Sequence, residues 1–258
     1  MPELPDVEIY KNYFNRTSLN RIIKKVEVLD SSILFYASVQ KLAGNLTGSR
    51  INSTARHGKY FFGKTEDGKY LMVHFGMTGR FEYRNDENIP KYSKVVLRFS
   101  GSLLSYICIR KLGKVSILED KDKFVKDKKL GPDALSLEWE SFKQLVNEKR
   151  GKIKGALMDQ KFIAGIGNIY ADEILFHSKI NPQRKVQDLQ EEELKKIFNS
   201  MGYVLNTAIK REAHPDKVPG SWLLPRRKKE AHCPKCKGKI KKITLSGRST
   251  YYCPSCQG

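Results

Sequence analysis

The feature that most constrains this chain is a set of four cysteines close to its end. Cys233-Pro-Lys-Cys236 and Cys253-Pro-Ser-Cys256 are separated by sixteen residues. Two Cys-x-x-Cys pairs at this spacing supply four thiolates for one tetrahedral, structural Zn²⁺. The alternative, that the four cysteines serve unrelated roles, is improbable. The segment is too short to build its own core, so we expect the metal to hold it together. We expect a zinc ribbon with strands over 239–245 and 250–252 and a tip at 246–249.

The charge of the chain points to a polyanionic partner. The 258 residues include 48 Lys+Arg against 28 Asp+Glu, a formal net charge of +20. Nucleic acid is favoured over a membrane, because no apolar run reaches the ~18 residues of a span. The alternative explanation for the positive net charge, taken by itself, is a solubility effect or a proteome rich in lysine. The acidic, proline-bearing N-terminus is no signal peptide, and the few cysteines indicate a reducing, cytoplasmic compartment.

The first residues, Met1-Pro2-Glu3-Leu4-Pro5, carry a possible nucleophile. If Met1 is removed, Pro2 offers a secondary amine that can attack a sugar aldehyde and form an iminium, with Glu3 beside it to move protons. The alternative is an ordinary helix opening, since Pro5 is followed by acidic residues. This role of Pro2 requires the removal of Met1.

The pattern along the chain predicts an α+β protein. Val7, Tyr10 and Phe14 fit one face of an N-terminal helix. Short strand-like runs then indicate an antiparallel sandwich or barrel. They cover 21–29, 50–55, 59–64, 70–75, 95–99, 103–109 and 114–118. A charged run at 119–129 is typical of a linker. Helical spacing follows around 139–146 and over 153–158, 169–177 and 191–210.

Three further motifs carry polar or exposed groups. Ala164-Gly-Ile-Gly-Asn168 ends in a good helix N-cap, and such a helix start can offer free backbone N–H groups to a phosphate. Lys59 opens a strand, where a lysine usually faces solvent. Met77 follows a strand in a glycine turn, although a methionine more often belongs to a core. Arg110-Lys111-Leu112 lies between two strands, and a basic hairpin loop is the plain interpretation.

Taken together, these motifs resemble the formamidopyrimidine-DNA glycosylase / endonuclease VIII family of bifunctional DNA glycosylase/AP lyases. The resemblance spans nearly the whole chain and rests on PELPDVE, HGKY, HFGMTG, RKLG, LGPDAL, MDQKFIAGIGNIYADEILF and CPKC…GRSTYYCPSCQ. It implies an N-terminal helix plus β-sandwich, a helix–two-turn–helix lobe with a zinc finger, and DNA in the cleft between the lobes. The expected divisions are a catalytic domain over 1–118, a linker over 119–133, a helical domain over 134–230 and a finger over 231–258.

The resemblance also implies roles for individual residues. Pro2 is the Schiff-base nucleophile, Glu3 its proton donor, and Lys59 an acid/base and phosphate contact. Asn168 and Arg248 hold the phosphates that flank a flipped nucleotide, and Arg248 assists the second elimination. Met77, Arg110 and Leu112 match the residues that fill the gap left by the extruded base. The further expected DNA contacts are Tyr92, Lys111, Lys149 and Lys154.

The chain departs from the common family pattern at several positions. Asp6 replaces Glu, Tyr92 replaces His, and Cys108-Ile109-Arg110-Lys111-Leu112 replaces Asp-Pro-Arg-Arg-Phe, so Leu112 cannot stack as an aromatic ring does. The stretch 211–230 lacks a recognisable lesion-capping sequence, whereas Leu4 favours the purine branch.

Our interpretation of the sequence is a monomeric base-excision repair glycosylase with β/δ-elimination activity. We expect it to act on double-stranded DNA with oxidised or abasic lesions, oxidised purines first, and to be nucleoid-associated if bacterial. The alternatives are an oxidised-pyrimidine enzyme of endonuclease VIII type, a relative that binds lesions without excising bases, and a non-catalytic zinc-ribbon DNA-binding module.

Overall fold

The computed structural model describes residues 1–258 and divides them into two compact units. The first comprises Met1–Pro2 and Asp6–Lys129, and the second comprises Glu3–Pro5 and Leu130–Gly258. The chain therefore changes unit twice within its first six residues. Neither unit has a helix with the length and apolar character that a membrane crossing requires.

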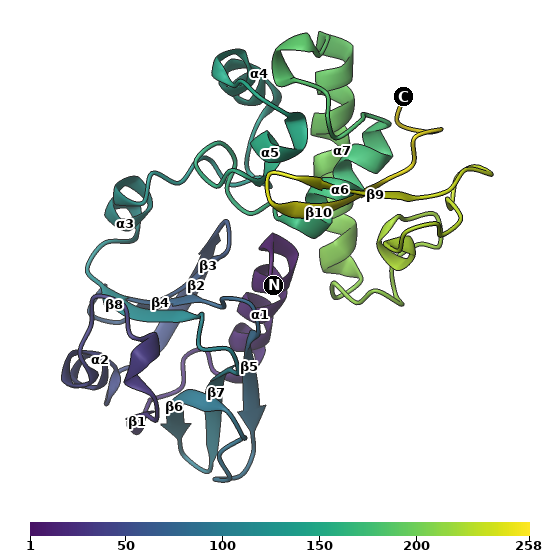
Figure 1. Ribbon diagram of the computed structural model, residues 1–258. Helices are drawn as coiled ribbons and strands as arrows, with labels where there is room; N and C mark the ends of the chain where they lie inside the picture. The colour runs from purple at the N-terminus through teal and green to yellow at the C-terminus, as the bar shows by residue number, and fades with distance from the viewer. The chain divides into compact units, whose positions relative to one another are not determined.

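The first unit is built on two four-stranded antiparallel sheets. One sheet has the order β1-β6-β7-β5 and the other β2-β3-β4-β8 (Figure 1). The strands are β1 (Lys25–Val28), β2 (Ile51–His57), β3 (Tyr60–Thr65), β4 (Tyr70–His74), β5 (Gly79–Arg84), β6 (Ser93–Phe99), β7 (Ser102–Cys108) and β8 (Lys114–Leu118). The expected antiparallel sandwich is confirmed, and its strands agree with the predicted runs to within a few residues. Strand β5 was not predicted.

Helix α1 (Leu4–Thr17) places its apolar face against both sheets. Phe14 lies 5.1 Å from Phe61 of β3 and 5.8 Å from Phe81 of β5, measured between ring centroids. Val7 and Phe14 are fully buried, as the helical spacing predicts. Helix α1 therefore joins the two sheets into one core.

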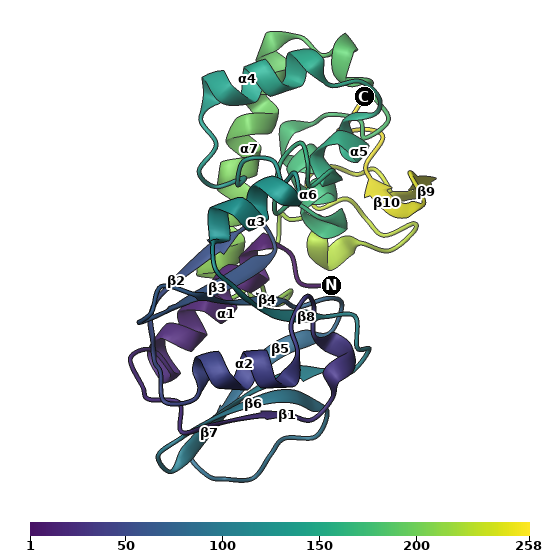
Figure 2. The same ribbon diagram turned by 90° about the vertical axis from the view of Figure 1, so that its left-hand side faces the viewer.

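Two helices of the first unit were not predicted. Helix α2 (Val39–Leu46) packs beside β1 and β8 and is capped by the hydroxyl of Ser38 (Figure 2). Helix α3 (Lys121–Asp127) lies inside the run expected to be a linker, and its N–H groups are capped by Asp120. Phe124 packs against Phe62 and Met72, on the outer face of the second sheet. The run expected to be a linker therefore contains a helix that the sequence pattern did not predict, with one buried aromatic residue and a capping aspartate.

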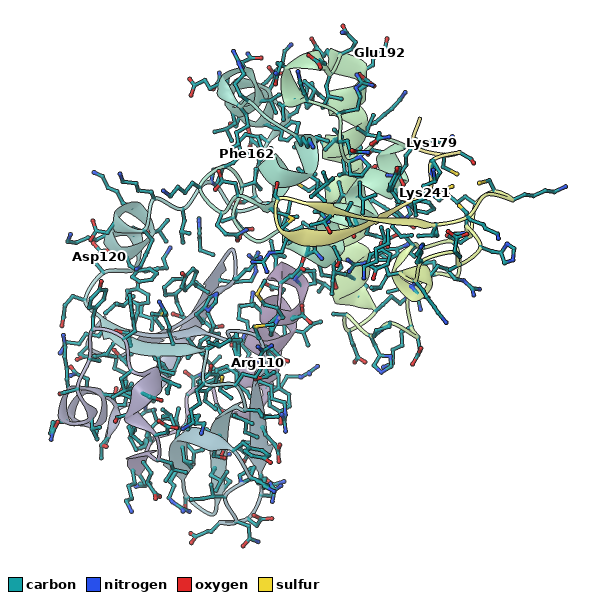
Figure 3. The ribbon with its side chains drawn as sticks, in the orientation of Figure 1. Arg110, Asp120, Phe162, Lys179, Glu192 and Lys241 are labelled. Atoms are coloured by element: carbon teal, nitrogen blue, oxygen red, sulfur yellow. The ribbon has the colours of Figure 1, made fainter.

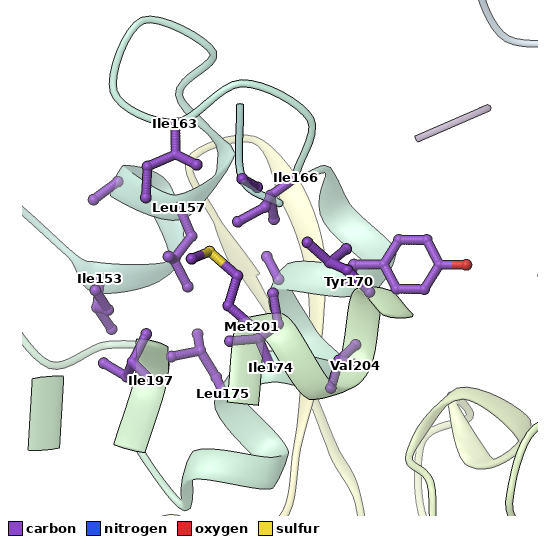
Figure 4. Close-up of a cluster of buried hydrophobic side chains, with 14 of the residues drawn as sticks. Ile153, Leu157, Ile163, Ile166, Tyr170, Ile174, Leu175, Ile197, Met201 and Val204 are labelled. Atoms are coloured by element: carbon purple, nitrogen blue, oxygen red, sulfur yellow. The ribbon is translucent and has the colours of Figure 1, made fainter. Parts of the chain in front are cut away.

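The second unit is mainly helical. Its helices are α4 (Trp139–Glu148), α5 (Ile153–Met158), α6 (Asn168–Ser178) and α7 (Glu191–Lys210), all close to the predicted ranges. Their apolar faces meet in one core, in which Ile174 and Leu175 of α6 lie against Ile197, Met201 and Val204 of α7 (Figure 4). Helices α6 and α7 are in extensive contact, so they form the frame of this unit.

The end of the chain forms the hairpin β9 (Lys241–Leu245) and β10 (Arg248–Tyr252), which packs on α6. Only Ser246 and Gly247 form the turn, and both have positive φ. The predicted four-residue tip is therefore too long. Arg248 is the first residue of β10 and pairs with Leu245. The turn is short because two left-handed residues match the twist of a hairpin.

Candidate active site and zinc centre

The start of helix α6 binds the carboxylate of Glu3. Both oxygens accept backbone hydrogen bonds, from Gly167 at 2.8 Å, Ile169 at 2.9 Å and Tyr170 at 3.3 Å. Glu3 is only 2% exposed. A Cβ on Gly167 would collide with the carboxyl group, so glycine is required for this close approach. The helix start was expected to offer free N–H groups to a phosphate, but a side chain of the same chain already occupies them.

Asn168 does not act as the N-cap that the sequence predicted. Gly167 is the N-cap and Asn168 is the first residue of α6. The amide nitrogen of Asn168 donates to the carbonyl of Ser249, next to Arg248, at 3.0 Å. Asn168 therefore links the helix start that holds Glu3 to the hairpin that carries Arg248, whose side chain is exposed.

Lys154 supplies the positive charge of a buried ion-pair cluster. Its side chain does not reach the surface, so the structure contradicts the direct contact with DNA that was predicted for Lys154. It is 1% exposed and lies 2.7 Å from Asp172. Its ammonium also donates to the hydroxyl of Thr250 at 2.7 Å and to the carbonyl of Ser249 at 3.2 Å. Lys154 thus fastens β10 to the helical core.

Asp172 is the centre of the same cluster, and the sequence analysis missed it. Its carboxylate pairs with Lys154 and, at 2.8 Å, with Arg227, and accepts the N–H of Tyr251 at 3.1 Å. Burial raises the pKa of Asp172 and lowers that of Lys154, while the opposite charges oppose both shifts. The signal available in the sequence was the acidic pair Asp172-Glu173 within an otherwise apolar helix.

Replacing Asp172 with Asn should destabilise the second unit by about 3 kcal/mol, because it leaves the buried Lys154 without a full counter-charge. Thermal or urea unfolding measures this loss. Asp216→Asn is the matched control, since that side chain is 92% exposed and should change stability by less than about 0.5 kcal/mol. Equal stability of the two variants would contradict the role given to Asp172.

The four cysteines of the finger converge as predicted. Their sulfurs lie within 4.8 Å of one another, with Cys233–Cys256 at 3.7 Å, Cys236–Cys253 at 3.6 Å and Cys236–Cys256 at 3.4 Å. Four thiolates on Zn²⁺ with bonds of ~2.3 Å stand ~3.8 Å apart, so the cage fits this ion.

Backbone amides support the finger. The N–H of Lys235 donates to the sulfur of Cys233 at 3.4 Å, and that of Gly238 to Cys236 at 3.3 Å. The Gly238 hydrogen bond and the other cysteines lower the pKa of Cys236 to about 7, whereas burial raises that of Cys253. A divalent cation lets all four groups ionise together. These N–H···S contacts orient the sulfurs as a structural zinc site requires.

In the first unit, Lys59 lies in the β2–β3 turn and is 8% exposed, although a lysine there was expected to face solvent. His74 of β4 is its neighbour. Burial, and then the charges of Lys59 and Lys114, lower the pKa of His74 to about 4. The ring is therefore neutral near pH 7, and its Nδ1 accepts the N–H of Gly76 at 3.3 Å.

Two loops of the first unit bring the expected gap-filling residues together. Met77 lies in the β4–β5 loop, and Arg110 (labelled in Figure 3) and Leu112 lie in the β7–β8 loop; all three are exposed. The loops are joined by pairing of Gly79 with Cys108 and by a 3.1 Å hydrogen bond from the Arg110 N–H to the Thr78 hydroxyl. Two apolar side chains and one cation thus lie at the surface on two joined loops.

The other expected DNA contacts have local partners. Lys111 pairs with Asp30 at 2.9 Å, and Lys149 with Asp159 at 2.6 Å. Tyr92 is 47% exposed, and its carbonyl accepts the N–H of Cys108. Both ion pairs are partly exposed, with side-chain exposures of 58% for Lys111 and 26% for Lys149.

The fold, the basic charge and the four-thiolate finger define a class of zinc-containing enzymes that act on nucleic acid. Comparison with known families makes this specific. Residues 1–115 match the formamidopyrimidine-DNA glycosylase N-terminal domain, 130–218 its H2TH domain, and 233–258 the zinc finger found in FPG and IleRS. The chain belongs to the formamidopyrimidine-DNA glycosylase family, a family of DNA-repair glycosylases with a four-cysteine zinc finger.

Individual relatives agree over their full length. A formamidopyrimidine-DNA glycosylase of Prochlorococcus marinus is 34% identical, with 100% of both chains covered. One of Rickettsia bellii is 33% identical over 100% of this chain and 99% of its own. The Lactococcus lactis Fpg, solved with abasic-site DNA, has a TM-score of 0.89 at 27% identity over 99% of each chain. A MutM solved with DNA containing carbocyclic 8-oxo-G gives 0.90 at 28% over 100% of each.

Proposed function

We propose that the protein excises oxidised purines, such as 8-oxoguanine and formamidopyrimidines, from double-stranded DNA and then cleaves the strand at the resulting abasic site. The observation that carries this proposal is the anchored Glu3. Three backbone N–H groups at the start of α6 fix the carboxylate of Glu3, so the third residue of the chain is held by a folded helix rather than left as a loose terminus.

In the proposed reaction, Pro2 acts as a secondary amine once Met1 has been removed. It attacks C1′ of the sugar, the base departs, and the iminium acidifies the C2′ protons so that successive eliminations cut the strand on both sides. Glu3 moves protons at this centre. Lys59, Asn168 and Arg248 hold the phosphates, and Arg248 assists the second elimination.

The extruded base leaves a gap in the duplex that costs a few kcal/mol to open. We propose that Met77 and Leu112 fill this gap by apolar contact and that Arg110 faces the base left without a partner on the opposite strand. Leu112 offers less stacking area than an aromatic side chain. Lys111, Lys149 and Tyr92 are proposed as outer contacts to the DNA backbone.

We further propose three functional segments. Residues 1–118 carry the nucleophile, residues 134–230 form the helical frame, and residues 231–258 form the zinc finger. Because the substrate is chromosomal DNA and the relatives named above are bacterial, we place the activity at the cytoplasmic nucleoid.

A panel of duplexes that each carry one defined lesion tests the substrate class. We expect 8-oxoguanine and formamidopyrimidine duplexes to be cleaved at least tenfold faster than duplexes with an oxidised pyrimidine, measured as kcat/KM from strand scission. An abasic duplex serves as the control for the lyase step alone. Faster cleavage of the pyrimidine lesions would replace this proposal with an endonuclease VIII-type specificity.

A further inference from the structure

An exposed aromatic residue of the first unit is held in a costly backbone conformation. Tyr36, between β1 and α2, is 79% exposed and has φ of 52°. Bulky side chains rarely adopt this left-handed region, and strain of this kind is concentrated at functional sites. Burial cannot explain why a tyrosine is retained at this position.

Lysines surround the aromatic pair that Tyr36 forms with Phe35. The two ring centroids are 4.0 Å apart. The ammonium of Lys128 lies 4.4 Å from the centroid of Phe35 and 5.7 Å from that of Tyr36, and the ammonium of Lys114 lies 4.3 Å from Phe35. An exposed ring flanked by cations matches the chemistry of single-stranded nucleic-acid sites.

A pocket of about 460 Å³ lies beside Tyr36. The end of β8 and helix α3, which begins after Asp120 in Figure 3, form most of its lining. Its apolar surfaces come from Ile117, Leu118 and Phe124, and its charged groups include Lys41, Lys128, Glu119 and Asp127. The volume suits one small ligand of nucleotide size.

We propose that this pocket binds one unpaired nucleotide of a DNA strand, with the base stacked on Tyr36 and the phosphate held by Lys41 and Lys128. The mixed charge favours this occupant over an acidic peptide. A nucleotide carries one anionic group for Lys41 and Lys128, and its base can donate amino hydrogens to Glu119 or Asp127, whereas acidic side chains of a peptide offer these carboxylates no donor. The site lies outside the residues assigned above to lesion excision.

The segment that carries Tyr36 runs beside the loop expected to fill the gap in the duplex. The N–H of Phe35 donates to the carbonyl of Val115 at 2.9 Å, and Lys111 pairs with Asp30 at 2.9 Å. The segment 30–36 therefore lies along the β7–β8 loop and the start of β8. A strand contacting that loop can extend onto Tyr36 without leaving the first unit.

The test uses the full-length zinc-loaded protein with a saturating unlabelled duplex that carries a tetrahydrofuran abasic analogue. This analogue lacks the C1′ hydroxyl and is not cleaved, so the lesion site stays occupied. Binding of a labelled short oligodeoxycytidine is then followed by fluorescence anisotropy. Tyr36→Ala should weaken this binding roughly tenfold, the usual effect of losing one base–aromatic stack, while Tyr36→Phe should stay within about twofold. Lys128→Gln, at the C-cap of α3, should also weaken it, and Lys126→Gln, in the last turn of α3 but outside the pocket lining, should not.

Tyr36→Gly separates binding from stability. Glycine accepts positive φ without strain, so this variant should unfold at no lower temperature than the wild type, yet bind the oligonucleotide as weakly as Tyr36→Ala. Cleavage of a short 8-oxoguanine duplex should be unchanged in all these variants, which distinguishes this site from the lesion site. Wild-type affinity in Tyr36→Ala, or Tyr36-dependent binding of an acidic peptide in place of the oligonucleotide, would overturn the proposal.

Discussion

A protein whose Pro2 nitrogen remains acylated should form no borohydride-trapped complex with abasic-site DNA and should lose strand cleavage by roughly three orders of magnitude or more. Inserting one glycine between Met1 and Pro2 makes this change while keeping the proline ring. An amide nitrogen has no free electron pair to attack the sugar, so the iminium cannot form. Trapping on denaturing gels and mass spectrometry of the N-terminus measure the result.

Pro2→Gly is the informative control, because it keeps a free amine but replaces the secondary amine with a primary one. We expect weaker but detectable trapping. Both variants should bind abasic DNA within about tenfold of the wild type, since the phosphate contacts are unchanged. Efficient trapping by the acylated chain would show that another amine is the nucleophile, and an intact Met1 in the active enzyme would lead to the same conclusion.

Zinc removal should act on DNA binding, whereas acylation of Pro2 should act on catalysis and leave DNA binding nearly unchanged. Without the ion, the four cysteines cannot remain together as thiolates, and the small cluster of Cys233, Cys253, Ile240, Leu223 and Phe176 loses its centre. Ser249, Thr250 and Tyr251 of β10 then separate from Lys154, Asn168 and Asp172, and Arg248 is no longer held in place. We expect affinity for an abasic duplex to fall at least about tenfold on chelation.

Cys253→Ser should reproduce the effect of chelation, and zinc should restore the chelated protein but not the variant. The fifth cysteine supplies the matched control, because Cys108 is buried in the sandwich core, in the other unit. Cys108→Ala should retain zinc and DNA affinity. Unchanged binding and cleavage after complete zinc removal would exclude the proposed contribution of Arg248.

Local patterns predicted much of the fold. The spacing of the two Cys-x-x-Cys pairs identified the four zinc ligands, because a tetrahedral ion restricts the residue types and their separation. Helices α4 to α7 followed from apolar periodicity, as did the face of α1 that carries Val7 and Phe14. Helix α3 and strand β5 were missed because their burial depends on distant partners. Phe124 needs Phe62 and Met72, and β5 needs β7.

The sequence by itself determined the finger, the order of strands before helices and the family, since these depend on residue types at short, fixed spacings. Only the tertiary structure decided what the polar side chains do. In the structure, the N–H groups at the start of α6 bind the carboxylate of Glu3, and Lys154 lies in the interior, paired with Asp172. These contacts join residues up to 167 positions apart, as between Glu3 and Tyr170. A carboxylate or ammonium can be satisfied by any partner that folding brings within about 3 Å, and local sequence does not specify that partner.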